Sequence, residues 1–266
     1  MKLDVAWSTT YSYSVPVRVL HTELRVVPAH RFGQQVHHWR LDADPPAAMH
    51  TLSDAFGNTV YHCDNLGSIQ RIHFEMEAAV ETSQGPLPQP EMRPLDLHSA
   101  RFPTKRCPFS DPIRDFAPAR GGRAPLSYAG TLLDAMAHGF VFEVGHTDVE
   151  STAEQLLELR RGVCQDFAHL MLAALRLHEV PSRYVSGYLA TGQGADATHA
   201  WVQVWDGSAW HGFDPANNCP QDERYVVIGV GRDYDDVPPI RGSFRGSAEE
   251  EWIATVAVQS SQAQSQ

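Results

Sequence analysis

Apolar and polar side chains alternate with a period of two in four stretches of the first 80 residues, at 9–15, 20–27, 35–41 and 69–80. Successive side chains of a β-strand point to opposite faces, so this alternation predicts strands that are buried on one face. The pair Gly57-Asn58 is typical of a tight turn between strands. Short strands at turn spacing predict a β-sandwich-like domain over residues 1–84.

Prolines are concentrated in the next segment. Nine of the eighteen fall in the range from Gly85 to Pro125. Proline fixes φ and lacks an amide donor, so such a segment disfavours both helix and sheet. We therefore expect a long connector over residues 85–125 that divides the chain into two domains. The alternative is an extended arm that wraps the surface of a single domain.

The apolar period becomes helical after the connector. Residues 127–140 carry an apolar stripe, Ser151 to Glu154 has the form of a capping box, and a third helix is expected to begin near Cys164. Strands are then predicted at residues 182–189, 199–205, 210–214, 225–230 and 252–259. Helices followed by antiparallel strands predict an α+β domain over residues 126–266.

Cys164 occupies the first turn of the third predicted helix. Unpaired amides and the positive end of the helix dipole stabilise a thiolate over a thiol at such a position. Gly162 lets the backbone bend sharply into the helix, and the amide of Cys164 is free to hold a developing oxyanion. These features favour a nucleophile. The alternative is a small apolar side chain packed at a helix start.

A histidine and an aspartate flank a predicted hairpin. Asp206-Gly207 is a strong signal for a two-residue turn, which would place His199 directly opposite Asp214 on one face. A four-residue loop would make the two residues diagonal neighbours on that face, whereas a one-residue bulge would separate them. An acid beside a histidine fixes its tautomer and stabilises the imidazolium, as in a catalytic triad. The alternatives are a surface charge pair and an aspartate that opens a loop.

Five segments after the connector form a recognisable set. They are Gly162-Val-Cys-Gln-Asp-Phe-Ala-His169, Arg183-Tyr-Val-Ser-Gly-Tyr188, His199-Ala-Trp201, Phe213-Asp-Pro215 and Gly231-Arg-Asp-Tyr-Asp-Asp-Val-Pro-Pro239. This set resembles the bacterial transglutaminase-like proteins, which are similar in fold to papain-type cysteine proteases. Residues 24–58 look like the β-rich N-terminal region that accompanies the family's catalytic domain. The resemblance implies Cys164 as nucleophile, His199 as general base and acid, and Asp214 as the residue that orients His199.

The chain departs from the papain pattern just before Cys164, where that pattern has a glutamine that holds the oxyanion. The segment from Gln155 to Arg160 offers no clear equivalent, and Tyr128 and Gln165 are further candidates among which the sequence does not choose. The acidic run from Asp233 to Asp236 lacks the glycine and closing glutamate of an EF-hand calcium loop. We interpret the family motif around Arg232 and Asp233 as a loop anchor.

Composition and charge narrow the function classes. The 266 residues carry 21 Lys and Arg against 32 Asp and Glu, and this net charge of −11 argues against nucleic acid and anionic membranes as partners. No run approaches the ~18 apolar residues of a membrane span, and no signal peptide is visible, so we expect a soluble cytoplasmic protein. The four cysteines are too scattered for a disulfide scaffold. Neither His37-His38 nor His62-Cys63 has ligand spacing, so no metal and no other cofactor is expected.

These observations predict a cysteine-dependent enzyme that transfers acyl groups from amide bonds through a thioester. Its partner would be a peptide or protein substrate that carries amide or glutamine groups. Hydrolysis, as in a peptidase or amidase, is favoured over cross-linking because nothing visible excludes water from the site. The alternatives are a protein-glutamine gamma-glutamyltransferase, and a non-catalytic module that keeps the fold to bind a peptide or partner. The substrate and the oligomeric state stay open.

Overall fold

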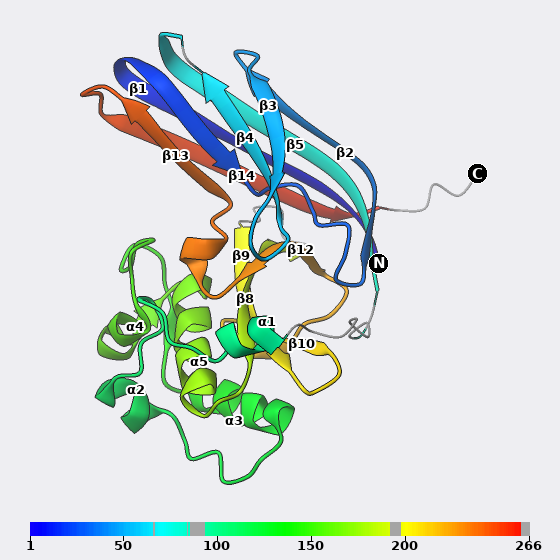
Figure 1. The fold of residues 1–266 in the computed structure, drawn as a ribbon, viewed down its shortest axis with the longest axis vertical. Helices are drawn as coiled ribbons and strands as arrows, with labels where there is room; N and C mark the ends of the chain where they lie inside the picture. The colour runs from blue at the N-terminus through cyan, green and yellow to red at the C-terminus, as the bar shows by residue number, and fades with distance from the viewer. Residues whose placement is uncertain (66, 84, 86–93, 192–197, 262–266) are drawn as a thin grey trace.

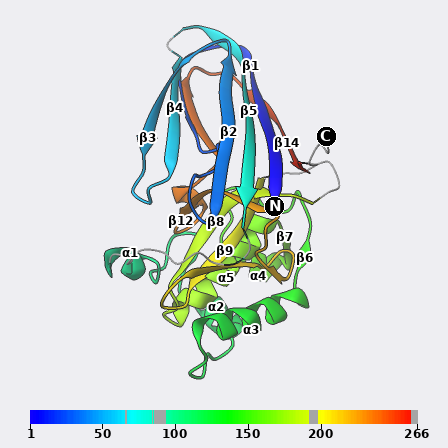
Figure 2. The ribbon, with the colours of Figure 1, turned by 90° about the vertical axis from the view of Figure 1, so that its right-hand side faces the viewer.

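A larger antiparallel sheet, a smaller antiparallel sheet and a group of helices build the chain, as Figure 1 shows for this computed structural model. The structure describes residues 1–65, 67–83, 85, 94–191 and 198–261. Figure 1 and Figure 2 place the larger sheet at one end of the molecule, α2 to α5 at the other end, and the smaller sheet between them. This arrangement confirms the predicted α+β architecture, with a β-rich N-terminal part ahead of helices and antiparallel strands.

The larger sheet has seven strands among the described residues and curls around one apolar face. Its strands are β1 (Lys2–Leu24), β2 (Gln34–Asp44), β3 (Ala48–Ser53), β4 (Thr59–Asn65), β5 (Ile69–Thr82), β13 (Ile240–Arg245) and β14 (Glu250–Ser260). Along β5, Ile72, Phe74 and Met76 are buried at every second position, as the alternation predicts. The curled sheet thereby encloses a sandwich-like core.

β1 is a single long strand where the sequence predicts two. It pairs with β5 and β14 in its first half and with β4 and β13 in its second half. Its pairing with β5 is interrupted between Ser12 and Val17, around Pro16, which has no amide to donate. The interruption lets β1 pass from one half of the curled sheet to the other.

The last two strands return to the first sheet. β13 and β14 pair with β1, whereas the sequence-based division at residue 126 groups them with the second domain. Val256 and Val258 of β14 are buried in the core of the larger sheet. Without β14, the first half of β1 would expose an unpaired edge, and pairing satisfies its amides and carbonyls. The strand predicted at residues 252–259 therefore forms, but in the first sheet.

The second part combines three longer helices with the smaller sheet. The helices are α3 (Pro125–Ala137), α4 (Ala153–Leu159) and α5 (Cys164–Leu177). The sheet, in the order β11-β10-β9-β8-β12, consists of β8 (Ser182–Leu189), β9 (Thr198–Trp205), β10 (Trp210–Asp214), β11 (Cys219–Pro220) and β12 (Tyr225–Gly231). The short strands β6 (Val141–Phe142) and β7 (Arg161–Gly162) pair in parallel. α5 is buried from Gln165 to Arg176 and packs on β8 and β9.

Part of the predicted connector is folded. Its first prolines lie in residues 86–93, outside the described residues, but α1 (Pro94–Ser99) and α2 (Asp111–Phe116) follow. Pro112 occupies the first turn of α2, where a missing amide costs no hydrogen bond. Cys107 and Ile113 are fully buried in the core that α3 and α5 form. Residues 107–117 thus pack with the helices, whereas Leu97 and Ala100 pack against Trp205 and Trp210 of the smaller sheet.

The two sheets share buried side chains. Tyr188 of β8 and Ile228 of β12 belong to the apolar cluster of the larger sheet. The hydroxyl of Tyr188 donates to the carbonyl of Val26 at 2.7 Å, and the Gln34 side chain bonds both backbone groups of Val227. The N-terminal part therefore covers an apolar face of the smaller sheet.

Within the described ranges we find no helix that combines the length and the apolar character needed to cross a membrane. The cytoplasmic location stays a prediction.

Candidate active site

Cys164 is the first residue of α5, as predicted. Its side chain is partly exposed, whereas the helix that follows is buried. The amides in the first turn of a helix have no partner within the helix, and together with the helix dipole they favour negative charge at this end. The thiol of Cys164 therefore lies where a thiolate, and an oxyanion beside it, are both stabilised.

An aspartate fixes the turn that leads into α5. Oδ2 of Asp166 accepts a hydrogen bond from the amide of Val163 at 2.8 Å and from the hydroxyl of Thr147 at 2.7 Å. A β-carbon on Gly162 would lie 2.6 Å from the same oxygen, so a side chain at this position would displace Asp166. Gly162 is thus needed for a close approach. The sequence suggested a sharp bend instead, but Gly162 is not among the residues with positive φ.

His199 and Asp214 lie on one face, in a register that differs from the predicted one. β9 and β10 pair Trp205 with Trp210, so a four-residue loop joins them and Asp214 is a diagonal neighbour of His199. Nε2 of His199 donates to Oδ2 of Asp214 at 2.6 Å. A shift of two residues keeps a side chain on the same face of a sheet, and the predicted contact therefore survives the wrong register.

Asp206 explains the longer loop. Its Oδ1 accepts from the amides of Ser208 and Ala209, at 2.7 and 2.9 Å, and from the hydroxyl of Ser208 at 2.9 Å. The amide of Asp206 in turn donates to the carbonyl of Ala209 at 3.1 Å. An aspartate that binds the amides of the next residues favours this wider loop over the two-residue turn that Asp206-Gly207 suggests.

The Asp214 carboxylate is fully buried and hydrogen-bonded at both oxygens. Besides His199, its Oδ2 accepts from the hydroxyl of Tyr225 at 2.8 Å and from the side-chain amide of Asn217 at 2.7 Å. Its Oδ1 accepts from the backbone amides of Ala216 and Asn217, at 3.0 and 3.1 Å. Burial alone raises the pKa of Asp214, but the hydrogen bonds outweigh burial and the pKa is lowered. The carboxylate therefore stays ionised beside His199.

His199 is hydrogen-bonded to Asp214, and Cys164 lies near enough to act on the pKa of its ring. Because Asp214 holds Nε2, Nδ1 is the ring nitrogen left for the thiol. Burial by itself lowers the pKa of His199, but the hydrogen bond to Asp214 and the nearby Cys164 raise it to about 10. The indole of Trp201 stacks on the imidazole with 6.1 Å between the ring centroids. The arrangement can hold a charged imidazolium next to sulfur at neutral pH.

Cys164 and His199 open onto a cavity of about 850 Å³. One wall belongs to the second part of the chain, and the opposite wall is formed by β1 and β14 with Trp7, Tyr11 and Trp252. Ligand pockets commonly measure roughly 300–1,000 Å³, so this cavity is large enough to hold a substrate segment across the thiol.

Two family models match the chain. Residues 116–215 match the transglutaminase-like superfamily, and residues 3–81 match the bacterial transglutaminase-like N-terminal region. An uncharacterized protein from Mycobacterium bovis is 33% identical over 92% of this chain and 88% of its own length. Another from Mycobacterium leprae is 30% identical over 92% of this chain and 94% of its own length. The chain belongs to the transglutaminase-like superfamily.

A solved structure carries the same fold across both parts of this transglutaminase-like chain. It is that of a candidate cysteine protease from Cytophaga hutchinsonii, with a TM-score of 0.81 and 22% identity. The similarity covers 100% of this chain and 92% of that chain. It confirms the predicted transglutaminase/papain-like fold.

The structure separates the three candidates for an oxyanion-holding side chain in this transglutaminase-like chain. Tyr128 is fully buried, and its hydroxyl donates to a backbone carbonyl at 2.9 Å. Gln155 caps α4, since its side chain accepts from the amide of Thr152 at 2.7 Å; this places the capping box one residue later than predicted. Gln165 lines the cavity next to Cys164. Of the three, Gln165 alone lines the cavity, and its side-chain amide donates to the carbonyl of Val149 at 3.3 Å.

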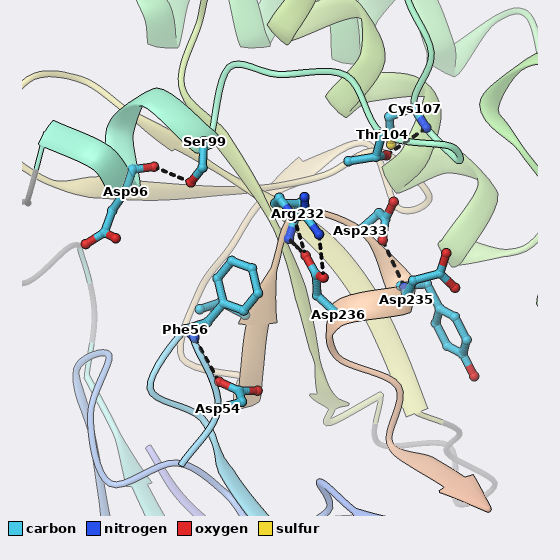
Figure 3. Close-up of polar contacts among 12 residues, drawn as sticks. Asp54, Phe56, Asp96, Ser99, Thr104, Cys107, Arg232, Asp233, Asp235 and Asp236 are labelled. Atoms are coloured by element: carbon cyan, nitrogen blue, oxygen red, sulfur yellow. Dashed lines mark hydrogen bonds and ion pairs between the residues drawn. The ribbon is translucent and has the colours of Figure 1, made fainter.

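The family motif around Arg232 anchors the loop between β12 and β13 (Figure 3). Arg232 donates twice to the carboxylate of Asp236, at 2.8 and 3.0 Å, and the carboxylate of Asp233 accepts from the amide of Asp235 at 2.9 Å. These contacts support the loop-anchor interpretation. The anchored loop holds Tyr234 in the cavity wall.

Sequence reasoning missed Tyr225, Asn217 and the wall of the cavity that β1 and β14 supply. Asn217 follows Asp214 by three residues, a spacing at which an aspartate commonly binds a backbone amide, and this signal was available. Tyr225 has no such local signal, because it reaches Asp214 from β12 across the site.

The cysteines provide a direct test of the activated thiol. We expect iodoacetamide to label Cys164 at pH 7 about ten times faster than Cys219, because a helix start favours the thiolate. Cys219 is the matched control, since it is also partly exposed and burial raises its pKa. Cys63 and Cys107 are buried, with pKa values raised to about 11 and about 12, and should react more slowly still. Mass spectrometry of the digested protein gives the rates, and equal rates for Cys164 and Cys219 would contradict activation.

Proposed function

We propose that this transglutaminase-like chain is a cysteine-dependent acyl-transfer enzyme that hydrolyses amide bonds through a thioester. The observation that carries the proposal is that Asp214 hydrogen-bonds His199, and that His199 and Cys164 line the same cavity. In this proposal Cys164 is the nucleophile, His199 is the general acid and base, and Asp214 orients His199.

The first half of the reaction forms the thioester. The thiolate of Cys164 attacks the amide carbonyl carbon, a C–S bond forms, and the carbonyl electrons move onto oxygen. The amide of Cys164, at the positive end of α5, stabilises this oxyanion. Nδ1 of the His199 imidazolium then gives its proton to the leaving nitrogen as the C–N bond breaks, and the amine departs.

The second half regenerates the thiol. Neutral His199 removes a proton from water while the water oxygen attacks the thioester carbonyl. Collapse of the adduct breaks the C–S bond, releases the carboxylic acid and restores the ion pair of thiolate and imidazolium. Asp214 holds Nε2–H of His199 in both halves, which keeps Nδ1 directed at the sulfur.

The cavity is consistent with water as the acceptor. It measures about 850 Å³, and a water molecule takes up roughly 30 Å³. The cavity is therefore large enough to admit water to the thiol that it contains.

A second candidate is transfer to a primary amine, as in a transglutaminase. The observation that favours it is Glu250 in the cavity wall. Among the described lining residues there is no Lys or Arg to pair with that carboxylate. This carboxylate, which hydrogen-bonds the Tyr13 side chain, has no cationic partner in the described lining and offers one to the ammonium group of a lysine-like acceptor.

An acceptor competition tests the choice. We expect glutamine-bearing peptides to give mainly hydrolysed product even when a primary amine is added, and mass spectrometry distinguishes that product from the amine adduct. Any adduct should decrease in the Glu250→Gln variant and stay unchanged in Glu249→Gln, whose position does not line the cavity. A predominance of adduct would favour the second candidate, and no product of either kind would contradict both.

The raised pKa of His199 predicts how activity depends on pH. The active form needs a protonated imidazole, and a raised pKa keeps the proton on the ring as pH increases through neutrality. We therefore expect kcat/KM to hold through neutral pH and to decline only in the alkaline range, well above the ordinary histidine value of 6.5. A decline centred near 6.5 would show that Asp214 and Cys164 do not hold the charge on His199.

A further inference from the structure

Two histidines and an aspartate gather on the outer face of the N-terminal sheet, far from the thiol in sequence. His21 of β1 pairs across the ladder with Asp64 of β4, and His62 lies two residues before Asp64 on the same face. Nδ1 of His21 lies 2.5 Å from Oδ1 of Asp64, and Nδ1 of His62 lies 3.5 Å from Oδ2. Both imidazoles thus meet one carboxylate, each at a different oxygen.

The nitrogen and oxygen atoms that these three side chains can offer to a metal are close enough to bind one ion. One such atom from each residue lies within 4.8 Å of the other two. Neighbouring ligands around a tetrahedral zinc ion are about 3.3 Å apart, given bonds of about 2.0 Å. The side chains are 46%, 29% and 37% exposed for His21, His62 and Asp64, so small rotations are enough to close the set.

A third histidine faces the cluster from the next strand. His50 of β3 is the direct cross-strand partner of His62. A third imidazole therefore stands next to the proposed ligands, on the strand that pairs with β4.

We propose that His21, His62 and Asp64 form a binding site for a divalent transition ion of the zinc class. Imidazole nitrogens with a single carboxylate suit zinc, nickel or copper, whereas magnesium and calcium prefer oxygen ligands. Three protein ligands leave a fourth position, which His50 or water can occupy. The bound ion links β1 to β4 and braces the part of the curled sheet where β1 has changed partners.

No sequence pattern indicates this site, because no two of the three ligands stand at a zinc-motif spacing. His62 and Asp64 are two residues apart on one strand, and His21 comes from another strand. Only the pairing of β1 with β4 brings them together. The site lies outside the cavity of Cys164, so its test is independent of the proposed catalytic function.

Calorimetric titration of the full-length chain with zinc tests the proposal. The measurement uses the Cys164→Ser variant as its background, so that the active-site thiol cannot act as a ligand. We expect one zinc per chain, and a rise in Tm on the order of 5 to 10 °C with zinc at about one hundred times Kd. Saturable binding should be lost in His21→Ala and in Asp64→Asn.

The matched control is His37→Ala. His37 forms an ion pair with Glu81 at 3.0 Å and is 43% exposed, which resembles His21, but it belongs to no three-residue cluster among the described residues. Zinc binding should be unchanged in this variant. Absence of saturable zinc binding, its retention in either cluster variant, or equal binding of magnesium would overturn the proposal.

Discussion

The Cys164→Ala variant is expected to lose amide hydrolysis by at least about a thousand-fold, because removing the nucleophile of a triad leaves only the residual effect of binding and oxyanion stabilisation. Folding should be retained, since the side chain is small and partly exposed. We expect the free energy of unfolding to change by less than about 1 kcal/mol. Steady-state assays of peptide amides and thermal melts followed by circular dichroism measure the two effects.

Cys219→Ala is the control for this experiment. Cys219 is also partly exposed, and its sulfur lies 3.3 Å from the hydroxyl of Tyr225. Its loss removes a thiol close to the site without removing the one near His199. Activity within a few-fold of the unchanged protein is expected, and substantial turnover by Cys164→Ala would refute the thioester mechanism.

The Asp214→Asn variant is expected to lose activity by about 10³ to 10⁴, because an amide in place of the carboxylate no longer fixes the His199 tautomer. The side-chain oxygen of asparagine can still accept the hydrogen bonds that the backbone amides of Ala216 and Asn217 donate to Oδ1 of Asp214. The new NH₂ group then meets His199, Tyr225 and the Asn217 side chain, all of which donate to Oδ2. Buried donors that face another donor lose their hydrogen bonds, and this loss costs about 1–3 kcal/mol of folding stability.

Asp206→Asn is the matched control for Asp214→Asn. Asp206 belongs to the same hairpin and also bonds a histidine, His211, at 2.7 Å, but it lies in the loop away from the cavity. This variant should leave kcat unchanged. Retention of more than about a tenth of the activity in Asp214→Asn would exclude the proposed role of Asp214.

These variants also separate an enzyme from a binding module that keeps the fold. A binding module would show no turnover to lose, and Cys164 would react with iodoacetamide no faster than Cys219. The buried hydrogen bonds of Asp214 and the charge they maintain on His199 are consistent with catalysis, because a module that only binds peptides needs neither.

The N-terminal part is more than an attachment to the catalytic part. Trp7, Tyr11 and Trp252 form one wall of the cavity, and β13 and β14 return from the end of the chain to complete the first sheet. Truncation at either end of the chain would therefore remove a wall of the cavity and expose the apolar face that surrounds Tyr188.

The sequence by itself determined the features that depend on neighbours along the chain. The period of apolar residues located α5 and the strands β8, β9 and β10, and the order of these elements placed Cys164 at a helix start. The hairpin put His199 and Asp214 on one face, even though Asp206 stabilises a longer loop than predicted. That contact survived because side chains two residues apart on a strand share a face.

Only the tertiary structure decided which distant segments meet. It brought Cys164 to His199, Tyr225 to Asp214, β14 to β1, and His21 to His62 and Asp64. Local patterns specify which face of an element is apolar, but not which other apolar face will cover it. That choice depends on the joint burial of many side chains and on the pairing of strand edges, and these exist only once the whole chain has folded.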